Sequence, residues 1–114
     1  MDSEIRCSHI LQKHTGSRRP FDSYRNKAVT RSPEEALEII KQIRSDLVNK
    51  KGDFGELAKK FSECGSAAKN GDLGRFGRGQ MQKTFEDAAY KLKVGELSEP
   101  VFSDSGTHII LRTE

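Results

Sequence analysis

The amino-acid sequence predicts an α+β fold, in which about four helices surround a four-stranded antiparallel sheet. Two observations support this prediction. Apolar residues recur with the helical period in three segments, and short apolar segments bounded by turn residues lie near both ends and in the middle of the chain. The length of 114 residues suits one domain, and no repeat, low-complexity segment or linker divides it. We therefore expect residues 1–114 to form a single domain, with a flexible N-terminus at 1–4.

The first part of the chain is predicted as a strand, a loop and a helix. The alternation of apolar residues in 5–14 is imperfect, which is typical of a central strand covered on both sides. The polar and basic residues 15–31 indicate a long loop. A helix follows, because Ser32 is a good N-cap, Pro33 suits the first helical position and Glu35 completes a capping box.

The remaining elements are predicted from caps and turn residues. A second helix is expected after the cap residue Asp53. A third is expected to be capped by Thr84, with Asp87 reaching back to the cap, and to run to about Leu92. The residues at 104–106 favour a hairpin turn. The other predicted elements are a short helical turn at 66–69 and strands at 73–76, 100–103 and 108–112.

Composition and charge narrow the classes of function. The net charge of +3 is modest and few aromatic residues accompany the basic ones, so we expect no nucleic acid as a partner. No segment is long and apolar enough for a membrane span, and the N-terminal residues do not resemble a signal peptide. Cys7 and Cys64 are more consistent with free thiols in a reducing compartment than with a disulfide. We expect a monomer of the cytoplasm and nucleus.

The segment 71–85 combines glycine with large apolar side chains. Four of its residues are glycine, which a packed helix does not favour, whereas a linker does not need apolar side chains. Leu73, Met81 and Phe85 therefore predict a shallow apolar pocket, with ordinary core packing as the alternative. The glycine spacing is not followed by a lysine-serine pair, so a phosphate-binding loop is not expected here.

Three cations lie close together in the first part of the chain. Lys13 ends the first predicted strand, and Arg18 and Arg19 follow in the loop. They can converge on one anion, because guanidinium groups match phosphate oxygens and lysine adds a point charge. A basic loop that is merely solvated is the alternative.

Two histidines and a cysteine are the other candidates for chemistry. His9 and His108 lie on predicted strands, and their imidazoles can hydrogen-bond each other if those strands are neighbours; buried histidines satisfied by other residues are the alternative. Cys64 is a candidate nucleophile if an imidazole is near, and an inert core thiol otherwise. Together with Cys7 these residues match no standard zinc spacing, so we expect no metal site.

Seven short motifs run through the chain in a fixed order. They are R-C-S-H-I-L at 6–11, K-H-x-x-S-R-R-P at 13–20, F-S-E-C at 61–64, G-D-L-G-x-F at 71–76, R-G-Q-M-Q-K at 78–83, F-E-D-A at 85–88 and V-F-S-D-S-G-T-H-I-I-L-R at 101–112. Together they resemble the parvulin family of peptidyl-prolyl cis/trans isomerases, and in particular its phosphorylation-specific branch. The resemblance covers nearly the whole chain.

The resemblance implies a parvulin-like, FKBP-like fold that needs no cofactor. The implied reaction is isomerisation of the bond between phosphoserine or phosphothreonine and proline, in proteins phosphorylated by proline-directed kinases. A binding module for such motifs without turnover is the alternative, and a cysteine-histidine thiol enzyme is a more distant one. The implied residues are Lys13, Arg18 and Arg19 for phosphate, Leu73, Met81 and Phe85 for the proline pocket, and His9, Cys64, Gln82, Ser105 and His108 for the catalytic centre.

Some residues depart from the common pattern of the family. Thr84 replaces a frequent proline, and Gly65 replaces a frequent serine beside Cys64. Other parvulins carry aspartate at the position of Cys64, which favours a non-covalent role for this thiol, namely tuning of local charge and hydrogen bonding. The sequence has no tryptophan, so we do not expect the WW module found in many relatives.

Overall fold

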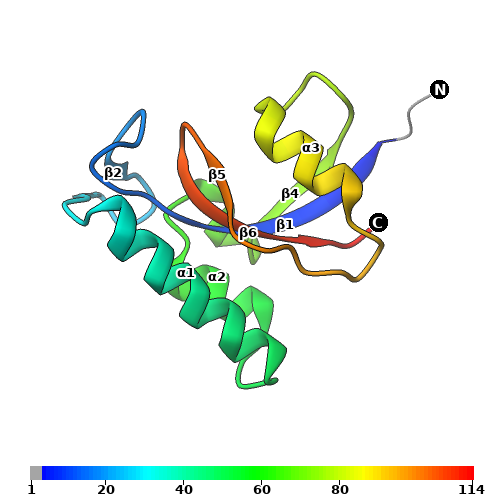
Figure 1. Ribbon diagram of the computed structural model, residues 1–114, viewed down its shortest axis with the longest axis horizontal. Coiled ribbons are helices and arrows are strands. Elements are labelled where there is room, and N and C mark those ends of the chain that lie inside the picture. Colours follow the sequence, from blue (N-terminus) through cyan, green and yellow to red (C-terminus); the bar gives the residue numbers. More distant parts are fainter. Residues whose placement is uncertain (1–3) are drawn as a thin grey trace.

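The computed structural model describes residues 4–114 and is built around a four-stranded antiparallel sheet (Figure 1). This sheet confirms the predicted fold class. Apart from Glu4, the predicted flexible N-terminus lies outside the described residues. The strands are β1 (Ile5–Gln12), β4 (Asp72–Phe76), β5 (Val101–Ser103) and β6 (Gly106–Arg112), in the order β4-β1-β6-β5 across the sheet.

Helices cover both faces of the sheet. The helices α1 (Pro33–Val48) and α2 (Phe54–Phe61) lie on one face, and α3 (Lys83–Lys91) lies on the other (Figure 1). A short 3-10 helix, η1 (Gly65–Lys69), follows α2, so the described residues contain three α-helices and one 3-10 helix. No helix within residues 4–114 combines the length and the apolar character that crossing a membrane requires.

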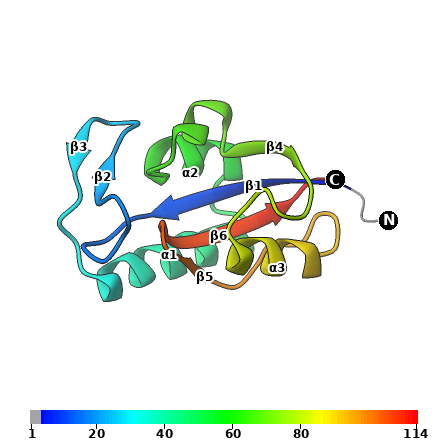
Figure 2. The ribbon, with the colours of Figure 1, turned by 90° about the horizontal axis from the view of Figure 1, so that it is seen from above.

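The two central strands divide the hydrophobic core into two parts. β1 and β6 run side by side in opposite directions (Figure 2), with His9 opposite Ile110 and Ile10 opposite Ile109. Because successive side chains of a strand point to opposite faces, this register gives both faces apolar residues, as the imperfect alternation predicted. The cluster under α3 contains Ile5, Cys7, Phe76, Phe85, Ala89, Leu92 and Ile110, and the cluster under α1 and α2 contains Ile10, Ile40, Ile43, Ala58 and Ile109.

The start of α1 has the predicted capping box. The Glu35 amide donates to Ser32 Oγ at 3.1 Å, and the Ser32 amide donates to Glu35 Oε1 at 2.8 Å. The bond from the Ser32 backbone lowers the pKa of the Glu35 carboxyl, because it stabilises the charged form. Local sequence signals alone therefore locate the beginning of this helix.

Residues 15–31 are more regular than the predicted loop. They contain a two-stranded ribbon formed by β2 (Phe21–Asp22) and β3 (Lys27–Ala28). The Asp22 side chain is fully buried and accepts two backbone amides of the turn. The Arg25 guanidinium donates to two backbone carbonyls, one in the last turn of α2 and one just after its end. These contacts tie the segment to the body of the protein, so the prediction of a loop was incomplete.

The predicted cap of α3 was wrong. The N-cap residue is Gln82, Thr84 lies inside the first turn, and no side chain makes a capping hydrogen bond there, that of Asp87 included. Gln82 instead directs its side chain to the turn between β5 and β6. A contact with another part of the chain therefore replaces the local cap that the sequence indicated.

Candidate active site

Two adjoining cavities lie beside the turn between β5 and β6. We call them the apolar cavity, with a volume of about 240 Å³, and the basic cavity, with about 220 Å³. Ser105 lines both, so the cavities are neighbours. The apolar cavity is lined by His9, Leu73, Gln80, Met81, Gln82, Phe85, Ser103, Ser105 and His108. The basic cavity is lined by Leu11, Lys13, Arg18, Arg19, Ser23, Glu63, Cys64, Gly65 and Ser105.

The apolar cavity contains the three residues predicted to form a proline pocket. Leu73 comes from β4, Met81 precedes α3, and Phe85 belongs to the first turn of α3. Phe85 is only 4% exposed and packs against Phe76, whereas the other two side chains are partly buried. Phe85 therefore both lines the cavity and packs in the hydrophobic core, so the pocket and core-packing interpretations are compatible for this residue.

The basic cavity brings together the three predicted cations. Arg18 and Arg19 are exposed, and the Arg18 amide donates to the Asp104 carbonyl at 2.7 Å, which holds the loop against the β5–β6 turn. Lys13 is nearly buried, and its Nζ donates to the Phe21 carbonyl at 2.6 Å. An ammonium group has three protons, so this bond leaves two of them for an anion.

An ion pair between the partly exposed Arg31 and the buried Glu63 fixes the position of Lys13 at the basic cavity. Glu63 is 3% exposed, and its Oε1 accepts from the Lys13 amide at 2.8 Å and from Arg31 Nη1 at 2.5 Å. Arg31 also donates to the Lys13 carbonyl at 3.0 Å. The sequence did not reveal this role of Glu63 and Arg31, because nothing local to either residue shows that both meet the end of β1.

The two predicted histidines form one hydrogen-bonded pair in the wall of the apolar cavity. His9 Nδ1 lies 2.9 Å from His108 Nδ1, which confirms that the imidazoles meet across neighbouring strands. His108 Nε2 lies 2.6 Å from Ser103 Oγ, and this oxygen also accepts the Ser105 amide at 3.1 Å. The register pairs Ser103 with Gly106, which lies two residues before His108. The Ser103 and His108 side chains therefore lie on the same face of the hairpin. The hairpin pattern was therefore the signal that could have identified Ser103.

Two arrangements of protons in the histidine pair fit these distances. Either Ser103 Oγ donates to His108 Nε2 and His108 Nδ1 donates to His9 Nδ1, or His9 Nδ1 donates to His108 Nδ1 and His108 Nε2 donates to Ser103 Oγ. The remaining ring nitrogen of the pair is His9 Nε2. This nitrogen is buried and has no hydrogen-bond partner among the described residues.

Burial keeps both imidazoles neutral at physiological pH. Desolvation lowers the pKa of His9 from 6.5 to about 4. The pKa of His108 is also lowered, first by burial and then by repulsion from a charged His9. The pair is therefore suited to supporting a cavity and not to proton transfer near neutral pH.

We expect the free energy of unfolding to fall as the pH drops from about 6.5 toward 4, and to be insensitive to these histidines above about pH 7. In that acidic interval the unfolded chain binds protons at both residues, whereas the folded chain keeps them neutral. Each histidine contributes a slope of up to about 1.4 kcal/mol per pH unit. Urea unfolding measured between pH 4 and 8 tests this, and a His14→Gln variant should retain the slope. A flat profile between pH 4 and 6.5 contradicts it.

Cys64 and the histidine pair line different cavities. Cys64 lines the basic cavity, and no hydrogen bond joins its thiol to either imidazole in the part of the chain that the structure describes. Cys7 is buried in the core under α3, and both cysteines are free. Within residues 4–114 no group of three or more His, Cys, Asp or Glu side chains is placed to hold a metal ion.

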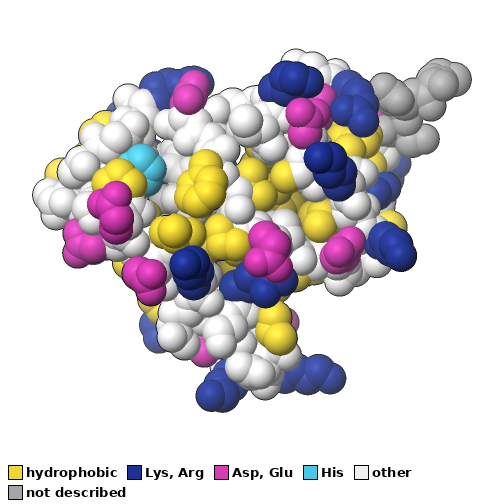
Figure 3. Space-filling view, viewed as in Figure 1, with side chains coloured by type: hydrophobic (Ala, Val, Ile, Leu, Met, Phe, Trp, Pro, Cys, Tyr) yellow, Lys and Arg dark blue, Asp and Glu magenta, His cyan; other side chains and the backbone are white. Residues whose placement is uncertain are grey.

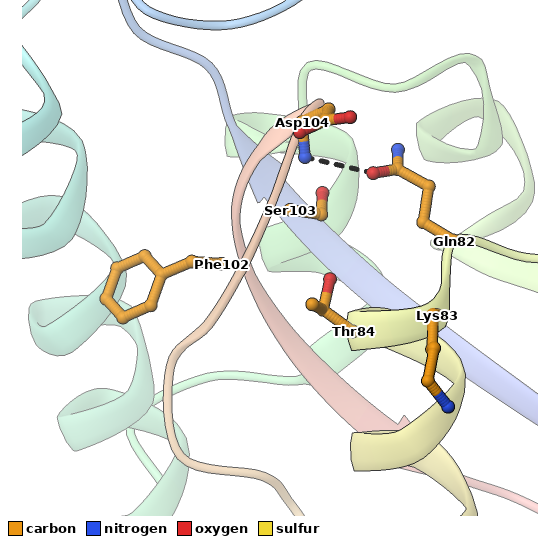
Figure 4. Close-up of a pocket in the computed structure, with 6 residues that line it drawn as sticks. All are labelled: Gln82, Lys83, Thr84, Phe102, Ser103 and Asp104. Carbon is orange, nitrogen blue, oxygen red and sulfur yellow. Dashed lines mark hydrogen bonds between the residues drawn. The ribbon is translucent and has the colours of Figure 1, made fainter.

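Gln82 connects the start of α3 to the β5–β6 turn. Its Nε2 donates to Ser105 Oγ at 2.8 Å, and its Oε1 accepts the Asp104 amide at 2.9 Å, the bond drawn in Figure 4. Ser105 lies between the two cavities, so these two hydrogen bonds hold the wall between the cavities in place. Among the predicted centre residues, Gln82, Ser105 and the histidines meet at the apolar cavity, and Cys64 meets only Ser105, in the basic one.

Comparisons with known proteins agree with this geometry. A family model described as the PPIC-type PPIase domain, or rotamase, matches residues 9–114. Over 113 residues the chain is 51% identical to Pin1 of Arabidopsis thaliana, named a peptidyl-prolyl cis-trans isomerase, and covers 95% of it with 96% of its own length. Over 109 residues it is 54% identical to dodo, a Drosophila melanogaster protein named for the same activity. This match covers 96% of the present chain but only 65% of the Drosophila protein.

A solved structure shows the same architecture. Peptidyl-prolyl isomerase ESS1 from Candida albicans superposes with a TM-score of 0.94 at 38% identity. The superposition covers 97% of this chain and 63% of the Candida chain. The similarity therefore extends over almost every element described above.

Proposed function

The chain belongs to the PPIC-type, or parvulin, family of peptidyl-prolyl cis/trans isomerases, and we propose that it acts where phosphoserine or phosphothreonine precedes the proline. On this proposal its substrates are phosphorylated proteins with Ser/Thr-Pro motifs, in the cytoplasm and nucleus. The phosphate occupies the basic cavity and the proline ring occupies the apolar cavity.

The adjacency of the two cavities supports this specificity. In a phosphoserine-proline pair the phosphate and the ring belong to successive residues, whose Cα atoms are about 3.8 Å apart in the trans form. Ser105 lines both cavities, so two such groups fit on either side of it. A cavity lined by Lys13, Arg18 and Arg19 favours a doubly charged phosphate over an uncharged serine hydroxyl.

The reaction breaks no bond, so the protein acts by stabilising the twisted amide. The uncatalysed rotation faces a barrier of about 18–20 kcal/mol. Holding the phosphate and the ring fixes both ends of the peptide while the carbonyl between them turns. Only contacts that are stronger in the twisted form than in the planar forms accelerate the step. A surrounding of low polarity helps, because it disfavours the charge-separated resonance form of the planar amide.

The histidine pair supports the proline-binding wall in this scheme. The Phe85 ring meets the His9 and His108 rings edge to face, with centroids 5.6 and 5.2 Å away. Both imidazoles are neutral near pH 7, so they bring no charge next to the ring of the substrate. They act as positioning residues, which hold Phe85 and the β5–β6 turn in their relative places.

Exchange NMR on matched peptides tests the proposal. Peptides with Glu-Pro, Ser-Pro and phosphoSer-Pro differ only before the proline, and cis/trans exchange is measured for each with and without the protein. We expect clear acceleration for phosphoSer-Pro and little for Ser-Pro. Binding without acceleration would identify a phosphopeptide-binding module, and equal acceleration for serine and phosphoserine would remove the phosphate specificity.

The Cys64→Asp variant tests whether the thiol is a covalent nucleophile or has a non-covalent role. We expect this variant to keep substantial turnover of a phosphoSer-Pro peptide, because no imidazole within residues 4–114 hydrogen-bonds the Cys64 thiol to activate it as a nucleophile. The same exchange NMR measures the rate, and Cys64→Ala serves as the uncharged control. Complete loss of turnover in both variants, with the fold intact, contradicts a non-covalent role.

A further inference from the structure

A third cavity lies between the β2–β3 ribbon and the end of α2, where Figure 2 shows the ribbon beside this helix. Its volume is about 150 Å³. We call it the charged cavity, because its lining includes four cations and two carboxylates, namely Arg25, Lys27, Arg31, Lys60, Asp22 and Glu63. The scheme above gives this cavity no role.

The two carboxylates of the charged cavity already have arginine partners. Asp22 Oδ2 accepts from Arg25 Nη1 at 3.1 Å. Glu63 Oε1 accepts from Arg31 Nη1 at 2.5 Å. Each pair combines one positive and one negative charge, so the two lysines leave the cavity with an excess of positive charge.

These two lysines have no carboxylate of their own. Lys27 belongs to β3 and Lys60 to α2, both are exposed, and neither has an ion-pair partner among residues 4–114. By contrast, many Lys and Arg side chains on the face shown in Figure 3 lie next to an Asp or Glu side chain. The positive potential of two unpaired ammonium groups at one cavity attracts an anion.

Gln12 adds a hydrogen-bond acceptor to the charged cavity. This residue lines the cavity and is 3% exposed, and its Nε2 donates to the Phe61 carbonyl at 2.6 Å. Because a carbonyl only accepts, the nitrogen of the Gln12 amide faces Phe61 and the oxygen faces away. This Oε1 is buried and has no hydrogen-bond partner among the described residues. A ligand that donates a proton to it removes the cost of a buried acceptor without a partner.

An acidic peptide supplies both groups that suit the charged cavity. A carboxylate has only acceptor oxygens, so it matches the two lysines but not Gln12 Oε1. Every peptide residue other than proline also carries a main-chain N–H, which is a donor for that oxygen. An inorganic anion without a proton lacks this donor. The two observations together therefore favour a peptide segment that contains Asp or Glu.

Shared lining residues place the charged cavity next to the active site. Glu63 lines both the charged and the basic cavity, and Ser105 lines both the basic and the apolar cavity. No residue lines both the charged and the apolar cavity, so the basic cavity is the middle one of the three. A substrate with its phosphate in the middle and its proline in the apolar cavity directs its preceding residues toward the charged cavity.

We propose that the charged cavity binds an acidic side chain on the second residue before the phosphoserine or phosphothreonine of the substrate. The inference rests on the proposed function and adds a specificity to it. Alternate side chains of an extended peptide point to the same side and lie about 6.6–6.8 Å apart. The second residue before the phosphoserine therefore presents its side chain on the side of the phosphate, whereas the residue between them points away.

Peptides with one altered residue test the proposal. In phosphoSer-Pro peptides with Glu or Gln at the second position before the phosphoserine, we expect kcat/KM for Glu to exceed that for Gln by about threefold to fivefold at low salt. The gain should fall as salt is added, because both lysines are exposed. Glu directly before the phosphoserine, or at the second position after the proline, should give no such gain. Exchange NMR at several peptide concentrations measures the rates.

Paired lysine variants provide the control. Lys27→Ala with Lys60→Ala should bring the Glu/Gln ratio close to one and leave the rate for the Gln peptide unchanged. Lys91→Ala with Lys93→Ala removes the same charge from exposed positions at the end of α3, which line none of the three cavities, and should keep the ratio. In spectra of the labelled protein, the side-chain amide of Gln12 should shift more with the Glu peptide than with the Gln peptide.

The outcomes separate this inference from the proposed function. A Glu/Gln ratio of one in the unaltered protein, an equal gain from Glu after the proline, or a ratio that survives the substitution of Lys27 and Lys60 overturns the proposal. If none of the peptides is isomerised, the proposed function fails; if the Glu and Gln peptides are isomerised equally, only this inference fails.

Discussion

Replacing Arg18 and Arg19 together by alanine should lower kcat/KM for a phosphoSer-Pro peptide by about 100-fold or more. A hydrogen bond to a charged group contributes about 1.5–3 kcal/mol, and the double variant removes at least two of them. Both residues are exposed, and the contact of Arg18 with Asp104 spans 3.5 Å between exposed side chains. We therefore expect the free energy of unfolding to change by less than about 1 kcal/mol. Exchange NMR measures the first quantity and urea unfolding the second.

A charge-matched variant separates local recognition from the overall charge. Lys50→Ala with Lys51→Ala removes the same two charges from an exposed turn after α1, outside all the cavities described above, and should leave turnover nearly unchanged. The arginine variant should also lose little of any residual rate on a Ser-Pro peptide. An equal loss on phosphorylated and plain peptides would show that the arginines act on the fold and not on the phosphate.

Replacing Glu63 by alanine should destabilise the protein by about 3–5 kcal/mol. The change removes the only carboxylate that pairs with Arg31 in the described chain, and it leaves the Lys13 amide without its acceptor. Glu63 is 3% exposed, so water does not readily replace the lost contacts. Urea unfolding at pH 7 measures the loss. We also expect weaker phosphopeptide binding, because the Arg31–Glu63 pair holds the end of β1.

The exposed Arg44–Glu99 ion pair provides a control for the Glu63→Ala variant. Arg44 and Glu99 are 2.8 Å apart, but 80% of the Glu99 side chain is exposed. Glu99→Ala should therefore cost less than about 1 kcal/mol. Glu63→Gln keeps the shape and an acceptor for the Lys13 amide, so its cost should fall between those of the two alanine variants. A Glu63→Ala variant as stable as Glu99→Ala would show that the buried pair contributes nothing.

Features that depend on neighbouring residues were predicted well from the sequence. The capping box of Ser32 and Glu35 located the start of α1, and the mixed pattern of β1 indicated a strand covered on both faces. The order of motifs along the chain then indicated which distant residues meet. The three cations that it grouped line one cavity, and the trio beginning with Leu73 lines another.

Features that depend on specific contacts between distant segments were not predicted. Thr84 is a better helix cap than Gln82 by local preference, but a contact with the β5–β6 turn determines where α3 begins. The anchoring of 15–31 depends on Arg25 reaching carbonyls more than 30 residues away. The contact of Ser103 with His108 depends on the register of the hairpin, and no single motif reveals that register.

The two strands at the centre of the sheet come from opposite ends of the described chain. β1 begins at Ile5 and β6 ends at Arg112, and the paired histidines are 99 residues apart. During synthesis on the ribosome, β1 emerges first and has an unpaired edge until β6 follows. A nascent chain that stops before β6 thus has neither a closed sheet nor an imidazole pair, and its open edge favours aggregation. The ability to isomerise other chains therefore arises only after β6 has been synthesised.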